Sequence, residues 1–292
     1  MSIENFKTEE EYVSQMNTGA LLNPRSDPTF KALFTSKTKE SREALHSFLE
    51  AATERKINKI ALRPNDSTQD YNGQRDVSYD ILCEFDDGLS ADIEMQAFDQ
   101  NYDYGKRAEY QVARLETTYL KKGDNWEKAP IVYQISVLDF KYDPNTNKVV
   151  SRYAMRTKDG RELSNSLNVI FIDLTNSSEL EEKIETNTAL ENWAIFLKNA
   201  DNPQKRDIIT KLTDKEAGLM NASKSLSNIS SDRDMWIAQY RQEMRERDQR
   251  SRISAAIHKK VIETAKNALA LNLSVNQVSK ITGLSVDEIA KL

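Results

Sequence analysis

The chain has 292 residues, of which 38% are hydrophobic and 30% are charged, with a formal net charge of −5. This length suits one large domain or two ordinary ones, and the composition is typical of a soluble globular protein rather than a disordered one. No apolar run approaches the roughly 18–20 residues that span a bilayer, and the amino-terminal MSIENFKTEEE lacks the apolar core of a signal peptide. We therefore expect a cytoplasmic protein without a membrane segment.

The rare residue types narrow the available chemistry. A single cysteine, Cys83, excludes internal disulfides and cysteine-based zinc clusters. The only histidines, His46 and His258, are far apart in sequence, which disfavours a histidine-dependent triad or zinc site. Hydrolytic chemistry would then rest on carboxylates. The net charge of −5 argues against a protein surface that is basic all round and binds DNA over its whole area, but it is compatible with a local basic patch.

The amino-terminal part divides at about residue 23. Residues 1–22 are polar without a regular period and predict a mobile leader. Asp27 and Pro28 then predict a helix start, with the aspartate as cap and the proline in the first turn. Asp27 has two interpretations, a plain cap or an acid that joins a site. The segments that follow predict a helix over 41–54, a short strand over 57–62 and a loop over 63–72.

A β-hairpin is predicted over residues 73–98. Two alternating runs flank Asp86-Asp87-Gly88, and one face is apolar from end to end. That core face includes Cys83, which we interpret as a packing residue. The apolar face carries Val77, Tyr79, Ile81, Cys83, Phe85, Leu89, Ala91, Ile93, Met95 and Ala97, and the other face carries Ser78, Asp80, Leu82, Glu84, Ser90, Asp92, Glu94 and Gln96.

The register of this hairpin brings two acids together. A three-residue loop sets Phe85 opposite Leu89, which in turn sets Asp80 opposite Glu94 and Ser78 opposite Gln96. Like charges in facing positions are destabilising, and nothing local offsets them. A divalent cation between the two carboxylates would turn this repulsion into binding. The alternative is an ordinary solvated face of a half-exposed hairpin.

Helices and strands alternate after the hairpin. Asp103 can cap a helix over 104–121, closed by Gly123. Strands are predicted over 131–140, in a central position, over 148–156 and over 167–174. We therefore expect an α/β domain over residues 23–200. In the helix, Ala108, Leu115 and Tyr119 are expected on the inner face, and Arg107, Tyr110, Gln111 and Arg114 on the other.

Residues 201–292 form a helical carboxy-terminal region in this prediction. Its long helix over 232–271 carries nine Lys or Arg against five acids between Arg233 and Lys266. This helix is either solvated by i,i+4 pairs or binds phosphate or a protein partner. Capping boxes at Ser274 and Ser285 predict two short helices joined at Gly283, similar to a helix-turn-helix.

The terminal helix pair is expected to serve assembly or regulation. Asp287 and Glu288 lie at the amino end of its second helix, where a DNA-reading helix would contact bases and phosphates. Two such short helices cannot bury enough surface alone, so they should dock on the long helix or on a second subunit. We therefore expect a homo-oligomer formed through the carboxy-terminal helices.

Three motifs carry a resemblance to a known family. Asp80 followed by Ile93-Glu94-Met95-Gln96 resembles the Rpn family of recombination-promoting nucleases, also described as PD-(D/E)XK nuclease family transposases. The segment DPTFKALF from Asp27 and the tail GLSVDEIAKL are similar to the same family. This resemblance implies a restriction-endonuclease-like (PD-(D/E)XK) α/β core with a mixed central sheet flanked by helices. It also implies a metal-dependent DNA endonuclease of low sequence preference, linked to recombination or to defence against foreign DNA.

The same resemblance, combined with the hairpin, suggests roles for individual residues. Asp80, Glu94 and the Met95 carbonyl would hold Mg²⁺, or alternatively Mn²⁺, and Gln96 would orient a water molecule. Arg107 and Tyr110 match an arginine and a tyrosine of the family; they could hold a phosphate or form surface pairs with Glu109 or Glu116. The competing function is a non-catalytic DNA-binding or toxin-partner protein that keeps the fold and acts through carboxy-terminal assembly.

Overall fold

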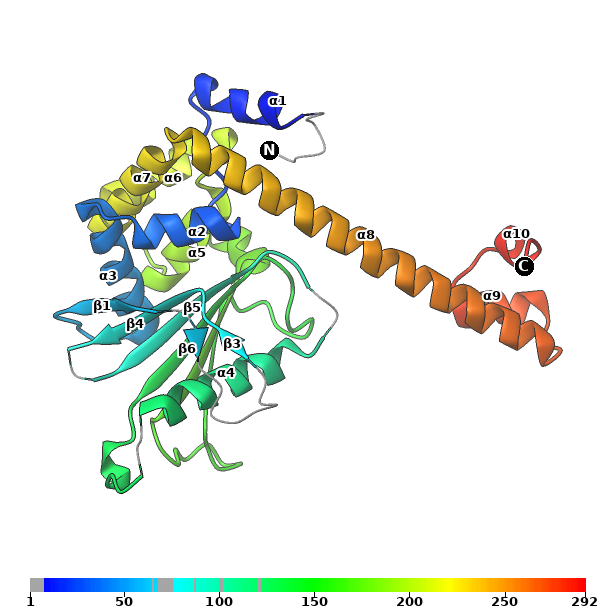
Figure 1. Ribbon diagram of the computed structural model, residues 1–292, viewed down its shortest axis with the longest axis horizontal. Helices are drawn as coiled ribbons and strands as arrows, with labels where there is room; N and C mark the ends of the chain where they lie inside the picture. Colours follow the sequence, from blue (N-terminus) through cyan, green and yellow to red (C-terminus); the bar gives the residue numbers. More distant parts are fainter. Residues whose placement is uncertain (1–7, 65, 68–75, 87, 100–101, 120–121) are drawn as a thin grey trace. The chain divides into compact units, whose positions relative to one another are not determined.

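The computed structural model describes residues 8–64, 66–67, 76–86, 88–99, 102–119 and 122–292. The chain forms two compact units, Met1–Gln242 and Glu243–Leu292. The first unit contains a six-stranded mixed sheet with helices on both sides (Figure 1). This confirms the predicted α/β class with a mixed central sheet.

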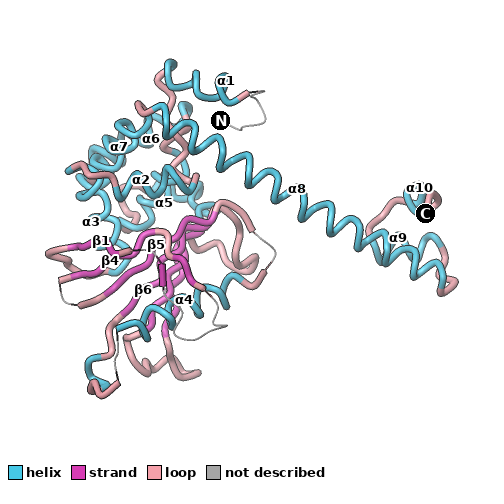
Figure 2. The backbone as a smooth tube through the Cα atoms, viewed as in Figure 1, coloured by secondary structure: helices cyan, strands magenta, loops and turns pink. Residues whose placement is uncertain are grey.

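The sheet has the strand order β1-β4-β5-β6-β8-β7. Its three middle neighbours β5, β6 and β8 are parallel, and the outer strands β4 and β7 pair with them in antiparallel fashion. Every residue of β6 is buried, which confirms its predicted central position (Figure 2). The bounds are β1 Ile60–Arg63, β4 Ile81–Phe85, β5 Ser90–Gln96, β6 Val132–Leu138, β7 Val150–Ala154 and β8 Leu167–Asp173.

The hairpin register is the predicted one. Ile81 pairs with Ile93, and the Phe85 amide donates to the Leu89 carbonyl, so the loop has three residues. Gly88 has a φ of 79°, the left-handed conformation that glycine adopts without steric cost. Asp87 lies outside the described residues. Cys83 is buried, as expected of a packing residue.

The first strand of the hairpin is shorter than predicted. A bend at Tyr79-Asp80 separates β4 from β3 (Val77–Ser78), which pairs with β2 (Asp66–Ser67) in a small second sheet. The prediction that Ser78 faces Gln96 is therefore wrong, because Ser78 pairs with Asp66. The bend also shifts the alternation, so that Tyr79 packs in one cluster with Leu82 of the opposite predicted face.

Helices cover the two faces of the sheet unequally. One face carries a helical layer whose aromatic core joins Phe34 to Phe48 and Trp193. The other face is covered by α4 (Tyr104–Tyr119), which packs on β6 and β8. The helices of the first layer are α2 Asp27–Thr35, α3 Lys39–Thr53, α5 Ala189–Asn199, α6 Arg206–Lys215 and α7 Ala217–Ser230. Further 3-10 helices lie at Trp126–Lys128, Leu174–Lys183 and Pro203–Lys205.

Two parts of the first unit differ from the sequence-based expectation. Residues 8–22 of the predicted mobile leader include α1 (Glu9–Val13) and a 3-10 helix (Ser14–Thr18), and Tyr12 is buried against Trp236. The first unit also extends to residue 242 rather than ending near 200, because α7 packs on α2 and α3. Amphipathic helices of this length need a partner for their apolar face, and these find one in the α/β core.

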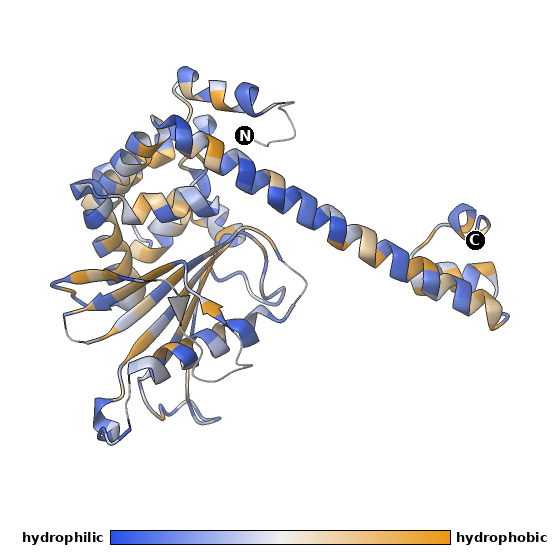
Figure 3. Cartoon of the chain, in the orientation of Figure 1, coloured by the Kyte–Doolittle hydropathy of each residue, from blue (hydrophilic) through white to orange (hydrophobic). Residues whose placement is uncertain are grey.

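The second unit begins within α8 (Arg233–Ala270) and ends with α9 (Val275–Thr282) and α10 (Val286–Ile289). Figure 3 shows a hydrophilic stretch along the middle of α8. Both predicted capping boxes are present, at Ser274 with Gln277 and at Ser285 with Glu288. The short helices dock on the end of α8, where Ala265, Ala268, Val278, Leu284 and Ile289 form a buried cluster. No helix in the described part of the chain has both the length and the apolar character to cross a membrane.

Candidate active site

Asp80 lies at the bend immediately before β4, one step beyond the last hairpin pair. Its Oδ2 accepts a hydrogen bond from the Met95 amide at 3.2 Å, and its Oδ1 lies 3.0 Å from Lys31 Nζ of α2. Burial raises the pKa of Asp80, and the Lys31 ammonium opposes that shift. The register therefore brings Asp80 beside β5 as predicted, but the carboxylate is directed toward a lysine on α2.

Glu94 is fully buried on β5 and receives its hydrogen bonds from α4. Tyr104 donates to Oε2 at 3.2 Å, Gln111 donates to Oε1, and Arg107 forms an ion pair with Oε2 at 3.2 Å. Burial raises the pKa of Glu94 to about 7; Arg107 opposes the shift and the charge of Asp80 adds to it. The two carboxylates are thus electrostatically linked, and each is neutralised by a cation from a different helix.

The polar face of β5 is not solvated. Ser90, Asp92 and Glu94 all lie on this face and are completely buried. The prediction that Gln111 and Arg114 lie on the outer side of α4 is wrong, since both are buried. The sequence did hold a signal for the side of α4 that meets Glu94. Tyr104, Arg107 and Gln111 are three and then four residues apart, a spacing that places them on one helix face.

The two predicted accessory residues on α4, Arg107 and Tyr110, differ in their surroundings. Arg107 contacts Glu94, Tyr102 and the ring of Tyr104, so its described contacts are with the site rather than with Glu109 or Glu116. Tyr110 is 37% exposed on α4. Both belong to the same helix, and Arg107 contacts the predicted site residue Glu94.

Asp27 is the first residue of α2 rather than its cap. The N-cap position belongs to Ser26, and Asp27 Oδ1 lies 3.0 Å from Lys31 Nζ, one helical turn further on. Lys31 thus joins Asp27 to Asp80. Lys31 was not among the predicted site residues. Its position four residues after Asp27 in DPTFKALF could have indicated it, because this spacing places both on one helix face.

Met95 and Gln96 complete the carboxyl end of β5. The Met95 amide donates to Asp80. In a β-strand the amide and the carbonyl of one residue point to the same side, so the Met95 carbonyl also faces Asp80. The Gln96 carbonyl accepts a hydrogen bond from the Asp139 amide at 2.9 Å, which fixes the end of β5 against β6. The Gln96 side chain lies at the partly exposed rim of the sheet.

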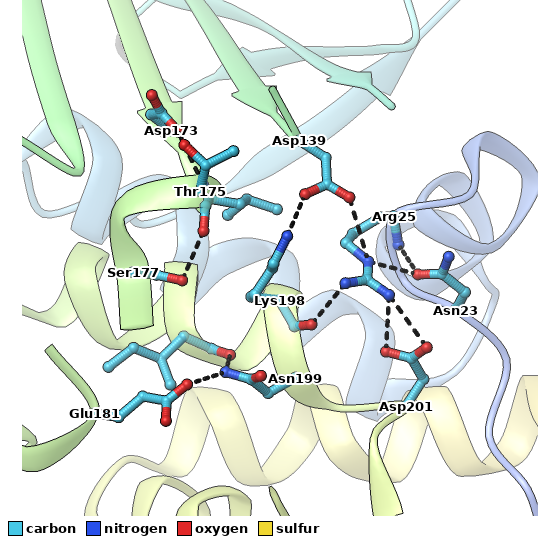
Figure 4. Close-up of polar contacts among 12 residues, drawn as sticks. Asn23, Arg25, Asp139, Asp173, Thr175, Ser177, Glu181, Lys198, Asn199 and Asp201 are labelled. Atoms are coloured by element: carbon cyan, nitrogen blue, oxygen red, sulfur yellow. Dashed lines mark hydrogen bonds and ion pairs between the residues drawn. The ribbon is translucent and has the colours of Figure 1, made fainter. Parts of the chain in front are cut away.

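A polar network supports this edge of the sheet (Figure 4). Asp139, which follows β6, accepts from Lys198 Nζ at 2.6 Å and lies 3.7 Å from Arg25 Nε. Arg25 also bonds both oxygens of Asp201, at 3.2 and 3.3 Å. The network ties the entry of α2 and the end of α5 to the strand end that holds Gln96. The sequence did not indicate this network, because its members come from three distant segments.

The described residues contain no group of three or more His, Cys, Asp and Glu side chains placed to hold a metal ion. A metal at this edge would therefore rest on two carboxylates and backbone oxygen. Oxygen donors of this kind are the ones that hard divalent cations prefer, so the set is chemically suitable.

A six-stranded mixed sheet with helices on both faces, with Asp80 just before β4 and Glu94 on the neighbouring β5, is the arrangement of a nuclease-like protein of the PD-(D/E)XK class. The family model for PD-(D/E)XK nuclease family transposases matches residues 24–256. The chain belongs to this family. Comparison with curated proteins and with solved structures found no match. Membership implies a nuclease or transposase-like function with DNA as substrate, and nucleases of this class generally use divalent metal ions.

Proposed function

We propose that the chain is a metal-dependent DNA endonuclease that hydrolyses phosphodiester bonds with low sequence preference. The observation that carries this proposal is the electrostatic link between the carboxylate of Asp80, just before β4, and that of Glu94 on β5. Such a pair is costly unless it is neutralised, and its retention in a buried position is typical of a functional site. The family description supports a role in DNA breakage, which we place in recombination or in defence against foreign DNA.

The ion site would consist of Asp80, Glu94 and the Met95 carbonyl. Mg²⁺ or Mn²⁺ bound there would polarise a phosphate oxygen and lower the pKa of a water molecule. Tyr104 and Gln111 hold the Glu94 carboxylate in a fixed orientation at the sheet surface. Because a ligating carboxylate must be ionised and the pKa of Glu94 is about 7, metal uptake should release protons near neutral pH.

Gln96 would act on the attacking water through hydrogen bonds. An amide can donate and accept but cannot serve as a charged general acid or base. Arg107 stabilises the ionised form of Glu94, and it is one-third exposed in its side chain, so part of its guanidinium also faces outward. Tyr110, exposed on the same helix, would assist in contacting the DNA backbone.

One observation favours the competing, non-catalytic function. Both Glu94 oxygens are already bonded by Tyr104, Arg107 and Gln111, so a metal would have to compete with protein donors. A protein that had lost catalysis could keep this closed arrangement to stabilise the fold. It would then bind DNA or a toxin-like partner and act through its carboxy-terminal helices.

A plasmid assay separates the two functions. Purified protein should nick supercoiled plasmid with Mg²⁺ or Mn²⁺ and not with EDTA. Asp80→Asn and Glu94→Gln should each lower the rate at least about a hundredfold, since metal activation supplies several kcal/mol of transition-state stabilisation. The matched control is Glu84→Gln on the same hairpin, whose carboxylate pairs with the exposed Arg63. Nicking by Asp80→Asn at the wild-type rate would refute the site assignment.

The same variants test metal binding directly. An ion that binds only the folded state raises the melting temperature with increasing concentration. Mn²⁺ should therefore stabilise the wild type and Glu84→Gln equally, and Glu94→Gln much less. Equal shifts in all three proteins would indicate weak surface binding instead.

A further inference from the structure

Lys31 joins two acids at the edge of the proposed site. Its Nζ lies 3.0 Å from Asp80 Oδ1 and 3.0 Å from Asp27 Oδ1. The i,i+4 spacing on α2 directs Asp27 and Lys31 to the same side of the helix, and α2 packs on β5. The lysine side chain is 35% exposed, so its ammonium contacts both carboxylates and still reaches the protein surface.

The predicted set of site residues on the hairpin has no cation of its own. Its members are Asp80, Glu94 and the uncharged Gln96, whereas phosphodiester hydrolysis places additional negative charge on phosphate oxygens. Lys31 brings a positive charge to Asp80 from outside the hairpin. A lysine ammonium is a compact point charge on a flexible four-carbon stem, which allows it to change partners over a short distance.

Arg107, the other cation near the carboxylates, is held more firmly. Its guanidinium forms an ion pair with the buried Glu94, donates a hydrogen bond to the Tyr102 hydroxyl at 2.7 Å, and lies over the ring of Tyr104. Lys31, in contrast, contacts two carboxylates that are both partly exposed. Of the two cations, Lys31 is the one with freedom to move toward a substrate.

We propose that Lys31 is a phosphate-binding residue of this site, which neutralises Asp80 in the metal-free protein and contacts the DNA phosphate when a divalent cation takes its place. This inference rests on the proposed function. Asp27 keeps the Lys31 ammonium near the site through their i,i+4 ion pair after the cation has replaced Lys31 at Asp80. Asp27 is thereby a positioning residue that acts through Lys31.

The test uses the full chain with Lys31→Gln and Lys31→Arg. The matched control is Lys128→Gln, because Lys128 also pairs with an aspartate four residues earlier but is far more exposed. The first measurement is Mn²⁺ binding by calorimetry, without DNA. Lys31→Gln should bind Mn²⁺ several-fold more tightly than the wild type, since the competing cation at Asp80 is gone.

The second measurement is binding of a short fluorescent DNA duplex with Ca²⁺ in place of Mg²⁺. Lys31→Gln should bind more weakly, and the slope of log affinity against log salt should fall by about 1, the value for one lost phosphate contact. Lys31→Arg should retain most of the affinity, because a guanidinium also binds phosphate. Lys128→Gln should match the wild type in both measurements.

The outcomes distinguish this inference from the proposed function. Unchanged Mn²⁺ and DNA affinity in Lys31→Gln, or weaker Mn²⁺ binding, would overturn the role of Lys31. If the wild type fails to cleave plasmid while Lys31→Gln still shows the two expected changes, the nuclease proposal fails and the phosphate-binding role of Lys31 stands.

Discussion

Asp92 shows how far burial can dominate the behaviour of a single side chain. It is completely buried on β5, two residues before Glu94. Burial raises the pKa of Asp92 well above its usual range, and the charges of Glu94 and Asp80 add to the shift; the amide of Gln134 opposes it. The folded chain therefore favours the protonated carboxyl group.

This shift predicts a pH-dependent stability. An acid with a raised pKa in the folded state contributes stability below its unfolded pKa, and that contribution is lost as pH rises toward the folded pKa. Asp92→Asn removes this loss. The free energy of unfolding of the variant, relative to the wild type, should rise by up to about 1.4 kcal/mol per pH unit above about pH 4. Urea denaturation of metal-free protein between pH 4 and pH 8 measures this difference.

The control for this experiment is Asp86→Asn, at the exposed turn of the hairpin. The pKa of Asp86 is lowered, chiefly by a hydrogen bond from Asn58, so its stability contribution has the opposite sign. The difference between this variant and the wild type should therefore not rise with pH. A pH-independent difference for Asp92→Asn would show that Asp92 is ionised within the fold.

At the scale of elements, the placement of α7 decides where the first unit ends. Gly218, in its first turn, meets Ser47 of α3 so closely that an added Cβ would overlap the Ser47 Oγ and Cβ atoms. The helix is further held by the Ser225 hydroxyl, which donates to the Leu33 carbonyl at 2.9 Å. These contacts make residues 201–242 a part of the α/β unit rather than of a separate helical region.

Gly218→Ala should destabilise the first unit by about 1–3 kcal/mol, the usual cost of overpacking a tight contact. In an open helix the same change would stabilise by about 1 kcal/mol, because alanine has the higher helix propensity. Urea denaturation measures the effect. Ser47→Gly in the same chain should restore part of the loss, so the two changes should be less than additive. Strict additivity would mean that α7 and α3 do not touch at this point.

At the scale of the whole molecule, the carboxy-terminal helices of the second unit leave several apolar side chains exposed. Its apolar residues divide into two sets, of which Val278, Leu284 and Ile289 are buried against α8. Ile281, Val286 and Leu292 remain exposed, at 62%, 48% and 38%. The buried set docks the short helices on α8, and the exposed set leaves apolar surface open to solvent.

We expect the exposed set to mediate homo-oligomerisation. The wild type should show a mass above the 33.4 kDa of one chain in light scattering, and the combined change Ile281→Ser, Val286→Ser and Leu292→Ser should return it to that mass. Helix content should stay unchanged in circular dichroism, in contrast to Val278→Ser, which removes a buried contact. If the triple variant keeps its mass and loses only DNA affinity, the helix pair is a DNA-binding helix-turn-helix.

Much of the local structure could be predicted from the sequence alone, which also pointed to Asp80 and Glu94 as a candidate acidic pair. Strict alternation around a glycine turn was sufficient to predict the hairpin and its register, because a slip of one residue would expose the whole apolar face. The capping boxes of α9 and α10 could also be predicted from the sequence, because each depends on two residues that are three positions apart. The resemblance in the IEMQ box and DPTFKALF led to the correct family and fold class.

The groups that contact the carboxylates of Asp80 and Glu94 could be found only in the tertiary structure. The bend at Tyr79-Asp80 directs one toward Lys31 of α2, and the position of α4 places Arg107 and Gln111 against Glu94. Neither follows from periodicity, because hydrophobic patterns do not indicate that a polar strand face is buried beneath a helix with matching polar residues. Such contacts arise between segments far apart in the chain, where the free energy of packing, rather than local propensity, sets the arrangement.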